Sequence, residues 1–146
     1  MTTEIEEKKM GRFSVEVELA NDEDIVRAKN GLIPAEQVRR VRIRGVVDSG
    51  ATRLVIPESV AQKLGLEVAG SVKVTYADGR SAERQVVRRI QLTYGGRADE
   101  FSAIIEPGRE SVLVGAVVLE VLDFLVDCVG QRLVPRDPKH IISEVE

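Results

Sequence analysis

Short segments in which apolar and polar residues alternate recur along this sequence, and glycine or proline separates many of them. Residues 13–19 alternate strictly between the two kinds, a period of two that predicts a strand with one buried face. Further apolar segments of strand length lie at 38–47, 54–56, 72–74, 86–92, 101–105, 112–114, 124–126 and 132–134. Asp78-Gly79, Gly95-Gly96 and Pro107-Gly108 predict turns between them. We therefore expect a mostly β fold.

Three segments depart from the period of two and predict short helices. Residues 25–29 follow the acidic run Asn21 to Asp24, which suits a helix N-terminus. Residues 58–64 lie between Pro57 and Gly65, the usual order of proline and glycine around a helix. Residues 116–122 follow Gly115. Residues 21–37 are interpreted as a helical insertion between two strands.

Length and composition indicate one globular domain. The chain has 146 residues, of which 43% are hydrophobic, and this length suffices for a core. We expect a flexible tail over residues 1–11 and a single domain over 12–146. No run of 18 apolar residues and no apolar leader is present, so we expect a cytoplasmic protein without a membrane partner.

Several function classes lack support in the sequence. The net charge is −3 and aromatic residues make up 3%, which argues against nucleic acid as a partner. Arg39, Arg40, Arg42 and Arg44 are interpreted as a solvated strand face. One histidine, His140, and one cysteine make a zinc site improbable, and no phosphate-binding glycine motif occurs. We therefore expect no metal and no cofactor.

The lone cysteine and histidine are expected to carry no chemistry. Cys128 lies in an apolar stretch, and we expect it to be a buried, inert thiol. His140 lies in a polar segment and is interpreted as a surface side chain. Neither has a recognisable catalytic partner in the sequence.

Asp48 differs from the other acidic residues in its surroundings. Val46 and Val47 precede it and the apolar segment 54–56 follows. A carboxylate in such a setting is normally hydrogen-bonded or functional. Gly50 allows a sharp backbone turn beside it. A simple turn between two strands, closed by the aspartate side chain, is the structural alternative.

The wider sequence resembles the retropepsin-like aspartic proteases over roughly residues 12–135. The active-site motif of that family is two apolar residues followed by Asp-Thr/Ser-Gly-Ala, and here Val46-Val47 precede Asp48, Ser49, Gly50, Ala51 and Thr52. The second family signature corresponds to Leu113, Val114 and Gly115 followed by the helix at 116–122. Between them the family has a hairpin flap, to which Tyr76, Ala77, Asp78, Gly79 and Arg80 are similar in place. The resemblance implies a closed β-barrel of the acid protease fold with two or three short helices.

The resemblance also implies a homodimer acting on a peptide or protein substrate. Aspartic protease chemistry needs two facing carboxyl groups, one ionised and one protonated. The chain holds one Asp-Ser-Gly, so a second copy must supply the second Asp48. Ser49 is then expected to support the pair of active-site loops, and Gly50 to contact the substrate backbone. Thr52 and Ala116 stand where viral members usually have an acid and an arginine that pair.

The sequence therefore predicts an aspartic endopeptidase in which each chain contributes Asp48. A non-proteolytic peptide-binding or scaffold module of the same fold remains the alternative, because one fold hosts many functions. A plain structural β-domain is a third, weaker interpretation.

Overall fold

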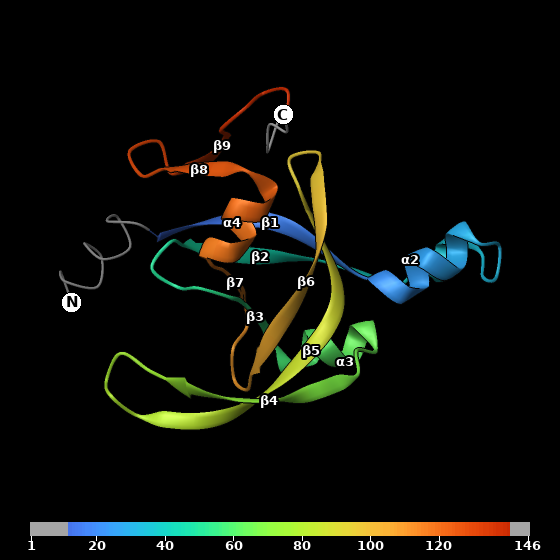
Figure 1. Cartoon of the computed structure of the whole chain (residues 1–146), viewed down its shortest axis with the longest axis horizontal. Coiled ribbons are helices and arrows are strands. Elements are labelled where there is room, and N and C mark those ends of the chain that lie inside the picture. Colours follow the sequence, from blue (N-terminus) through green and yellow to red (C-terminus); the bar gives the residue numbers. More distant parts are fainter. Residues whose placement is uncertain (1–11, 141–146) are drawn as a thin grey trace, which may run out of the picture.

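A computed structural model of the chain describes residues 12–140, which form a β-barrel with short helices at its surface (Figure 1). The elements in chain order are β1 (Arg12–Asn21), α2 (Asp22–Lys29), the 3-10 turn η1 (Ala35–Gln37), β2 (Arg40–Asp48), β3 (Leu54–Pro57), α3 (Glu58–Leu64), β4 (Val68–Thr75), β5 (Ser81–Tyr94), β6 (Arg97–Glu106), β7 (Val112–Val114), α4 (Ala116–Leu122), β8 (Phe124–Asp127) and β9 (Arg132–Pro135). The predicted tail at 1–11 lies outside the described residues.

Six strands close into a barrel, as the resemblance implied. The main sheet runs β1-β2-β7-β3-β6-β5-β4, and an additional pairing of β1 with β5 joins its ends into a ring. This closing pair runs from Glu18↔Thr93 to Asn21↔Ile90. Of the strands in this sheet, β4 lies outside the ring and pairs with β5. Residues 12–17 of β1 pair with β2 alone.

Most strand pairs are antiparallel, but two pairs are parallel. β2 lies parallel to β7, and β3 lies parallel to β6. Each parallel pair joins strands that are distant in the sequence, so short-range turn signals could not reveal it. The parallel pairs bring the segment around Asp48 beside the later apolar segment 112–114.

The core lies inside the barrel and under α3 and α4. In β1 the buried residues Phe13, Val17 and Leu19 face the core between less buried polar residues, which confirms the period-two pattern of residues 13–19. The largest fully buried side chains are Leu19, Leu54, Ile56, Leu64, Ile90, Leu92, Val17, Val47, Val87, Val112, Val118 and Pro57. Each Å2 of buried apolar surface contributes about 25 cal/mol, so this burial drives folding and no disulfide bond or metal ion is required.

The helices at 58–64 and 116–122 are confirmed with the predicted bounds. α3 follows Pro57 and ends at Gly65, whose φ of 63° is left-handed, a conformation that glycine adopts without strain. The first insertion helix is longer than predicted. It begins at Asp22 because the Asn21 side chain accepts a hydrogen bond from the Asp24 amide and caps it.

The insertion between β1 and β2 is held to the body through Asp24. This buried carboxylate accepts hydrogen bonds from the backbone amide of Arg39 at 3.1 Å and from its guanidinium at 2.8 and 3.0 Å. Arg39 therefore does not belong to a purely solvated arginine face. Arg40 and Arg42 do extend along the exposed strand surface, where they pair with Glu18 and Glu16.

The C-terminal hairpin of β8 and β9 is fixed to the barrel by a buried arginine. The Arg97 guanidinium donates to the carbonyl oxygens of Leu122 and Asp123 at 3.0 and 2.9 Å and also to that of Asp137. The Asp123 carboxylate is buried and pairs with Arg136. These contacts fix the position of the hairpin relative to α4.

The interpretation of Cys128 as a buried thiol was wrong. Cys128 is exposed, because the apolar stretch that holds it bends at the turn between β8 and β9 instead of entering the core. His140 is exposed, as expected. No helix within residues 12–140 is long and apolar enough to cross a membrane.

We predict that Asp24→Asn destabilises the fold at neutral pH by about 1–3 kcal/mol, because it removes a buried charged hydrogen-bond acceptor. The hydrogen bonds from Arg39 hold the pKa of Asp24 below its ordinary value of 3.8. The carboxylate therefore stabilises the fold above pH 3.8 and loses this effect as the pH falls through the lowered pKa.

Urea unfolding of both proteins at pH 7 and about pH 3 measures this effect. The difference in unfolding free energy should be smaller at the acidic pH. Glu23→Gln, at an exposed neighbouring position, is the control and should change stability by less than about 0.5 kcal/mol. An equal loss at both pH values would contradict the role given to the Asp24 charge.

Candidate active site

The two sequence signatures lie side by side at one end of the barrel. In the parallel pair of β2 and β7, Val46 is the register partner of Leu113 and Val47 that of Val114. Gly45 allows this close packing, since a Cβ there would lie 3.1 Å from a methyl group of Val114. The chain thus leaves both strands at the same end, where Asp48 is the last residue of β2 and Gly115 directly follows β7.

The loop after Asp48 is hydrogen-bonded to the N-terminus of α4. The amide of Ala116 donates to the carbonyl oxygen of Ala51 at 2.8 Å, and the amide of Val117 donates to that of Thr52 at 2.9 Å. These amides belong to the first turn of α4, where backbone donors have no partner within the helix. The loop carbonyls satisfy them and thereby fix the loop on the helix.

Gly115 is required by this contact. A Cβ at Gly115 would lie 2.5 Å from the Arg53 carbonyl oxygen and 2.8 Å from the Arg53 nitrogen. Any side chain would therefore collide with backbone atoms. Thr52 and Ala116 replace the charged pair of viral members, and here backbone hydrogen bonds between residues 51–52 and 116–117 join the two segments.

The Asp48 carboxylate lies at the end of β2 with its side chain 16% exposed. The Gly50 amide donates to Oδ1 at 3.0 Å, and Arg12 Nη2 lies 3.2 Å from Oδ2. A Cβ on Gly50 would come within 3.2 Å of Oδ1. The side-chain-closed turn considered as an alternative is therefore formed, and it also holds the carboxylate in a defined position.

A second arginine lies in the electrostatic neighbourhood of Asp48. Arg109, in the turn between β6 and β7, donates to the carbonyl oxygen of Ser111 at 2.7 Å. Burial lowers the pKa of Arg109, and the charges of Arg12 and Arg44 act in the same direction, whereas Glu106 and Asp48 oppose them. Positive charge therefore surrounds Asp48 on the side of β1 and of this turn.

The predicted flap forms a two-stranded arm that extends beyond the barrel. Pairing of β5 with β6 begins at Val86, so the preceding part of β5 pairs with β4 alone, from Ser71↔Gln85 to Thr75↔Ser81. A bulge lies between Val87 and Ile90, and Arg89 there has a φ of 63°. Such a bulge bends the strand where the arm leaves the barrel.

Tyr76 ties the tip of this arm to the end of β6. Its hydroxyl donates to Glu106 Oε1 and Oε2 at 2.8 and 2.7 Å. Arg84 donates to the same hydroxyl at 3.0 Å and pairs with Glu106 at 3.1 Å. Burial, and then the hydrogen bond to Glu106, raises the pKa of Tyr76. The tip itself is closed by Arg80, which pairs with Asp78 at 2.7 Å.

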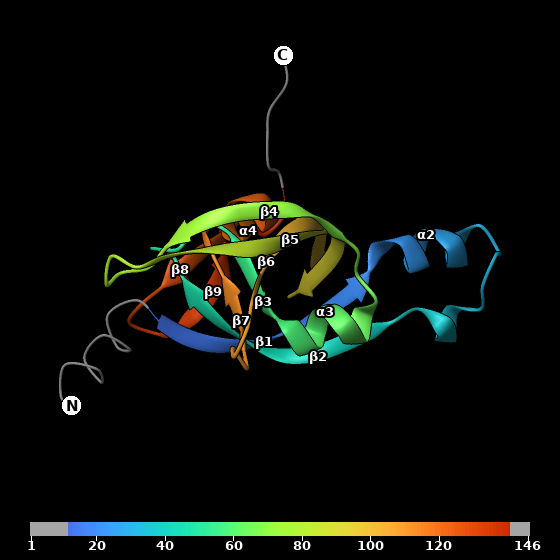
Figure 2. The same cartoon turned by 90° about the horizontal axis from the view of Figure 1, so that it is seen from below.

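The structure brings some of the predicted site residues together and leaves others apart. Residues 48–52 and 113–115 meet directly. Residues 76–80 lie at the same end of the molecule as the loop after β2, the end away from α2 (Figures 1 and 2). Within residues 12–140, no hydrogen bond or ion pair joins the arm to that loop. Ala77 and Gly79 are exposed at the tip.

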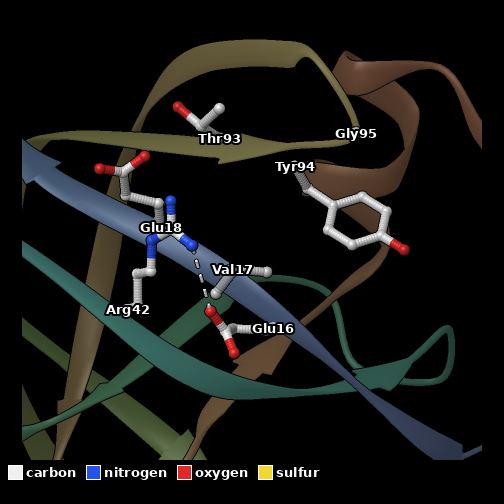
Figure 3. Close-up of a pocket in the computed structure, with 7 residues that line it drawn as sticks. All are labelled: Glu16, Val17, Glu18, Arg42, Thr93, Tyr94 and Gly95. Carbon is white, nitrogen blue, oxygen red and sulfur yellow. Dashed lines mark ion pairs between the residues drawn. The ribbon is translucent and has the colours of Figure 1, made fainter.

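Two shallow cavities of the barrel surface are lined by residues of β1 and β2. One, of about 240 Å3, lies between β1, β2 and the β5–β6 turn (Figure 3). Its charged side chains are engaged in strand-to-strand contacts, with Arg42 3.7 Å from Glu16. Among the described residues, no three His, Cys, Asp or Glu side chains gather as a metal site.

Sequence reasoning missed Arg12, Arg84, Glu106 and Arg109 as neighbours of the predicted site. Arg12 faces Asp48 because the β1–β2 register pairs these two residues. The helical insertion between the strands hides that register in the sequence. The alternation of side chains along the two strands of the arm indicates that Tyr76 and Arg84 lie on the same face. It does not indicate what they contact.

Comparisons with known proteins agree with this geometry. A family model described as aspartyl protease matches residues 35–119, more than half of the chain. No curated protein matches the chain in sequence. The solved structure of EIAV protease complexed with the inhibitor HBY-793 is similar, with 15% identity, a TM-score of 0.55, and coverage of 84% of this chain and 92% of that one. The solution structure of Simian Foamy Virus (mac) protease has 16% identity, a TM-score of 0.47, and coverage of 73% and 91%.

We predict that Gly115→Ala destabilises the fold by about 1–3 kcal/mol, since the added methyl group must displace the backbone of residues 52–53. Denaturant unfolding measures the loss. Val117→Ala, at an exposed position of the same helix, is the control and should stay within about 0.5 kcal/mol of the parent. A neutral Gly115→Ala variant would show that the loop and α4 are not in firm contact.

We predict that Tyr76→Phe makes the arm more mobile, because Glu106 then loses the hydroxyl that holds the tip. Amide hydrogen exchange of residues 74–82 should become faster while that of the barrel strands stays unchanged. Tyr94→Phe is the matched control away from the arm. Unchanged exchange at the tip in Tyr76→Phe would mean that the hydroxyl does not restrain it.

Proposed function

The chain belongs to the aspartyl protease family, and from this premise we propose that it is an aspartic endopeptidase that works as a homodimer. Each chain contributes Asp48 as its catalytic carboxylate, and residues 12–146 form one catalytic domain. The substrate is a peptide or protein segment that binds between the two copies of the Asp48 loop. The retropepsin-like barrel supports this proposal.

The observation that carries the proposal is the firm placement of one carboxylate at the junction of the two signatures. Asp48 is the last residue of β2, and the loop after it is hydrogen-bonded to the first turn of α4. The Gly50 amide fixes the carboxylate by donating to Oδ1. Aspartic protease chemistry needs two such groups with their geometry held in advance. The sequence contains one Asp-Ser-Gly, so two-fold symmetry is the direct source of the second group.

The two Asp48 side chains have different roles in the proposed reaction, one as a general base and one as a hydrogen-bond donor. The ionised carboxylate accepts a proton from a water molecule, whose oxygen attacks the peptide carbonyl. The protonated one donates a hydrogen bond to that carbonyl oxygen, on which negative charge develops. Carboxyl groups held so close titrate as a pair and share one proton.

Arg12 must move aside when the two Asp48 side chains meet. Its guanidinium occupies the Oδ2 side of Asp48 at 3.2 Å, and the Arg12 side chain is 57% exposed. The Arg12 side chain is largely in solvent, so its guanidinium stays hydrated when it leaves Asp48. Ser49 is exposed beside Asp48, and we propose that it supports the pairing of the two loops.

The β4–β5 arm is proposed to cover bound substrate. It extends from the barrel as two strands, and its tip lies at the same end as the Asp48 loop (Figure 2). Closure of such an arm excludes water and completes the binding site. The contact of Tyr76 with Glu106 then sets the resting position of the arm.

A non-proteolytic peptide-binding module is the alternative, and the Arg12–Asp48 ion pair is the observation that favours it. A guanidinium that stays on Oδ2 occupies the side of the carboxylate that a second Asp48 must approach. The endopeptidase proposal predicts peptide cleavage that depends on Asp48, whereas the peptide-binding module predicts no cleavage.

We predict that Asp48→Asn lowers peptide cleavage by at least about a hundredfold, because an amide cannot accept the proton from water in either half of the dimer. Fold and dimer should persist, since the two side chains have nearly the same size. The wild type should show a pH optimum with a decline on both sides, as a shared proton requires, and the optimum should lie below neutral pH.

Cleavage of a diverse peptide library by purified protein, with sedimentation of the same samples, measures both effects. Asp99→Asn, which makes the same chemical change at an exposed position of β6, is the matched control and should retain cleavage. Cleavage by Asp48→Asn at the wild-type rate would place the chemistry elsewhere.

A further inference from the structure

The outer face of β2 carries a row of arginines that leads toward Asp48. Side chains at alternate positions of a strand point to the same face, so Arg40, Arg42, Arg44 and Val46 share the face of Asp48. The two arginines farther from Asp48 pair with glutamates of β1. Within residues 12–140, Arg44 forms no ion pair with a carboxylate, although it is exposed. The guanidinium of Arg44 is therefore free on the part of the row nearest to Asp48.

A shallow cavity of about 290 Å3 lies beside Arg44. Its lining consists of Ser14, Val15, Glu16, Arg42, Ile43 and Arg44. The two apolar residues of the lining are half-buried, and the hydroxyl group of Ser14 is on an exposed residue. Glu16 and Arg42 lie 3.7 Å apart and offset each other's charge (Figure 3). Arg44 therefore gives this cavity an excess of positive charge.

A second guanidinium without an ion pair to a carboxylate within residues 12–140 belongs to Arg109. It donates to the carbonyl oxygen and the hydroxyl of Ser111 at 2.7 and 3.3 Å. Ser111 directly precedes Val112, the register partner of Gly45, so this turn passes beside Arg44. Burial lowers the pKa of Arg109, and the positive charge of Arg44 contributes to the lowering. Arg44 and Arg109 therefore belong to one basic region.

The nearby carboxylates are mostly engaged with other arginines. The ion pairs are those of Asp48 with Arg12, Glu16 with Arg42 and Glu106 with Arg84. Glu110, in the same turn as Arg109, is exposed and offsets part of the charge. A guanidinium binds a carboxylate through paired N–H donors, so an acidic side chain is the ligand chemistry that fits this region.

An apolar strip connects the basic region with Asp48. Val46 lies between Arg44 and Asp48 on the same face of β2, and its register partner is Leu113. Both apolar residues are half-buried, so a peptide can pack against them on its way from Asp48 to Arg44. The basic region is thus continuous with the candidate active site, which favours the substrate as its occupant.

We propose that Arg44 and Arg109 bind acidic side chains of the substrate at positions away from the cleaved bond. The proposal rests on the proposed function, because it takes the substrate peptide of that function as the occupant. Arg44 lies four residues before Asp48 on an extended strand, a separation of about 13 Å. An extended peptide covers this separation with about four residues, so the acid is expected about three to five residues from the cleaved bond. Two-fold symmetry supplies one such site for each half of the substrate.

The first experiment measures peptide binding by isothermal titration calorimetry. The probes are peptides of about twelve residues with an apolar centre and Glu, Gln or Lys at one outer position at a time. Peptides with Glu about three to five residues from the centre should bind the wild type at least about fivefold more tightly than their Gln counterparts. Lys should bind most weakly. The preference for Glu should decrease between about 0.05 M and about 0.3 M salt, because the charges are exposed and screened.

Variants of the two arginines show whether they cause this preference. Arg44→Gln and Arg109→Gln should each reduce it, and Arg44→Lys should keep most of it because the positive charge remains. Arg88→Gln, at an exposed position of β5, is the matched control and should keep the full preference. Circular dichroism confirms the fold of each variant.

Three outcomes overturn the proposal. The first is equal binding of Glu and Gln peptides by the wild type. The second is a preference for Glu that survives in the double variant Arg44→Gln/Arg109→Gln. The third is a wild type that binds no peptide of the set.

Cleavage of the same peptides separates this proposal from the proposed function. In a cleaved peptide, Glu should lower KM and leave kcat nearly unchanged, because the basic region lies away from the reacting atoms and binds substrate and transition state equally. Cleavage that depends on Asp48 but not on Glu sustains the protease and refutes the acidic-peptide site. A preference for Glu that depends on Arg44, without any cleavage, sustains the site and refutes the protease.

Discussion

The contact between the Asp48 loop and the start of α4 is the constraint on which the rest of the site depends. Two amides of α4 donate to the carbonyl oxygens of residues 51 and 52, and Gly115 lets the backbones approach until no side chain would fit. The parallel pairing of β2 with β7 aligns the two segments before they meet. Because backbone groups make the contact, side chains around it can vary. This explains how the geometry persists with Thr52 and Ala116 in place of a charged pair.

The parts of the fold that depend on local patterns were predictable from the sequence. Pro57 and Gly65 bracket α3 as predicted, and Gly95-Gly96 closes the β5–β6 hairpin. Contacts between distant segments were not predictable from hydrophobic period and turn residues alone. Alternation shows which face of a strand is buried, but it does not show which other strand pairs with it. The β1–β5 closure and both parallel pairs are of this kind. The resemblance supplied the barrel, which periodicity could not.

The same distinction holds for the site. Asp48 and Gly115 could be found because each belongs to a motif with a fixed place after an apolar strand. Arg12 could not, since its position opposite Asp48 depends on a register set across the insertion. Cys128 was misjudged because an apolar stretch suggests burial, whereas here the chain turns at Cys128 and the hairpin has an exposed outer face.

Under the proposed function, a chain that holds half a site has to couple its chemistry to assembly. In the single chain the Asp48 carboxylate is held by the Gly50 amide on one side and Arg12 on the other. The amide contact lies within the loop and can persist in a dimer, whereas the guanidinium occupies the side that a second carboxyl group must approach. In the proposed dimer, the Asp48 of a second chain takes the place of Arg12 beside the first Asp48. A negative charge then replaces a positive one next to the carboxylate, which favours the state in which the two Asp48 groups share one proton. Assembly would thus convert a paired, surface carboxylate into one member of an acid–base pair, and the contact energy that holds two like groups together must come from elsewhere in the interface.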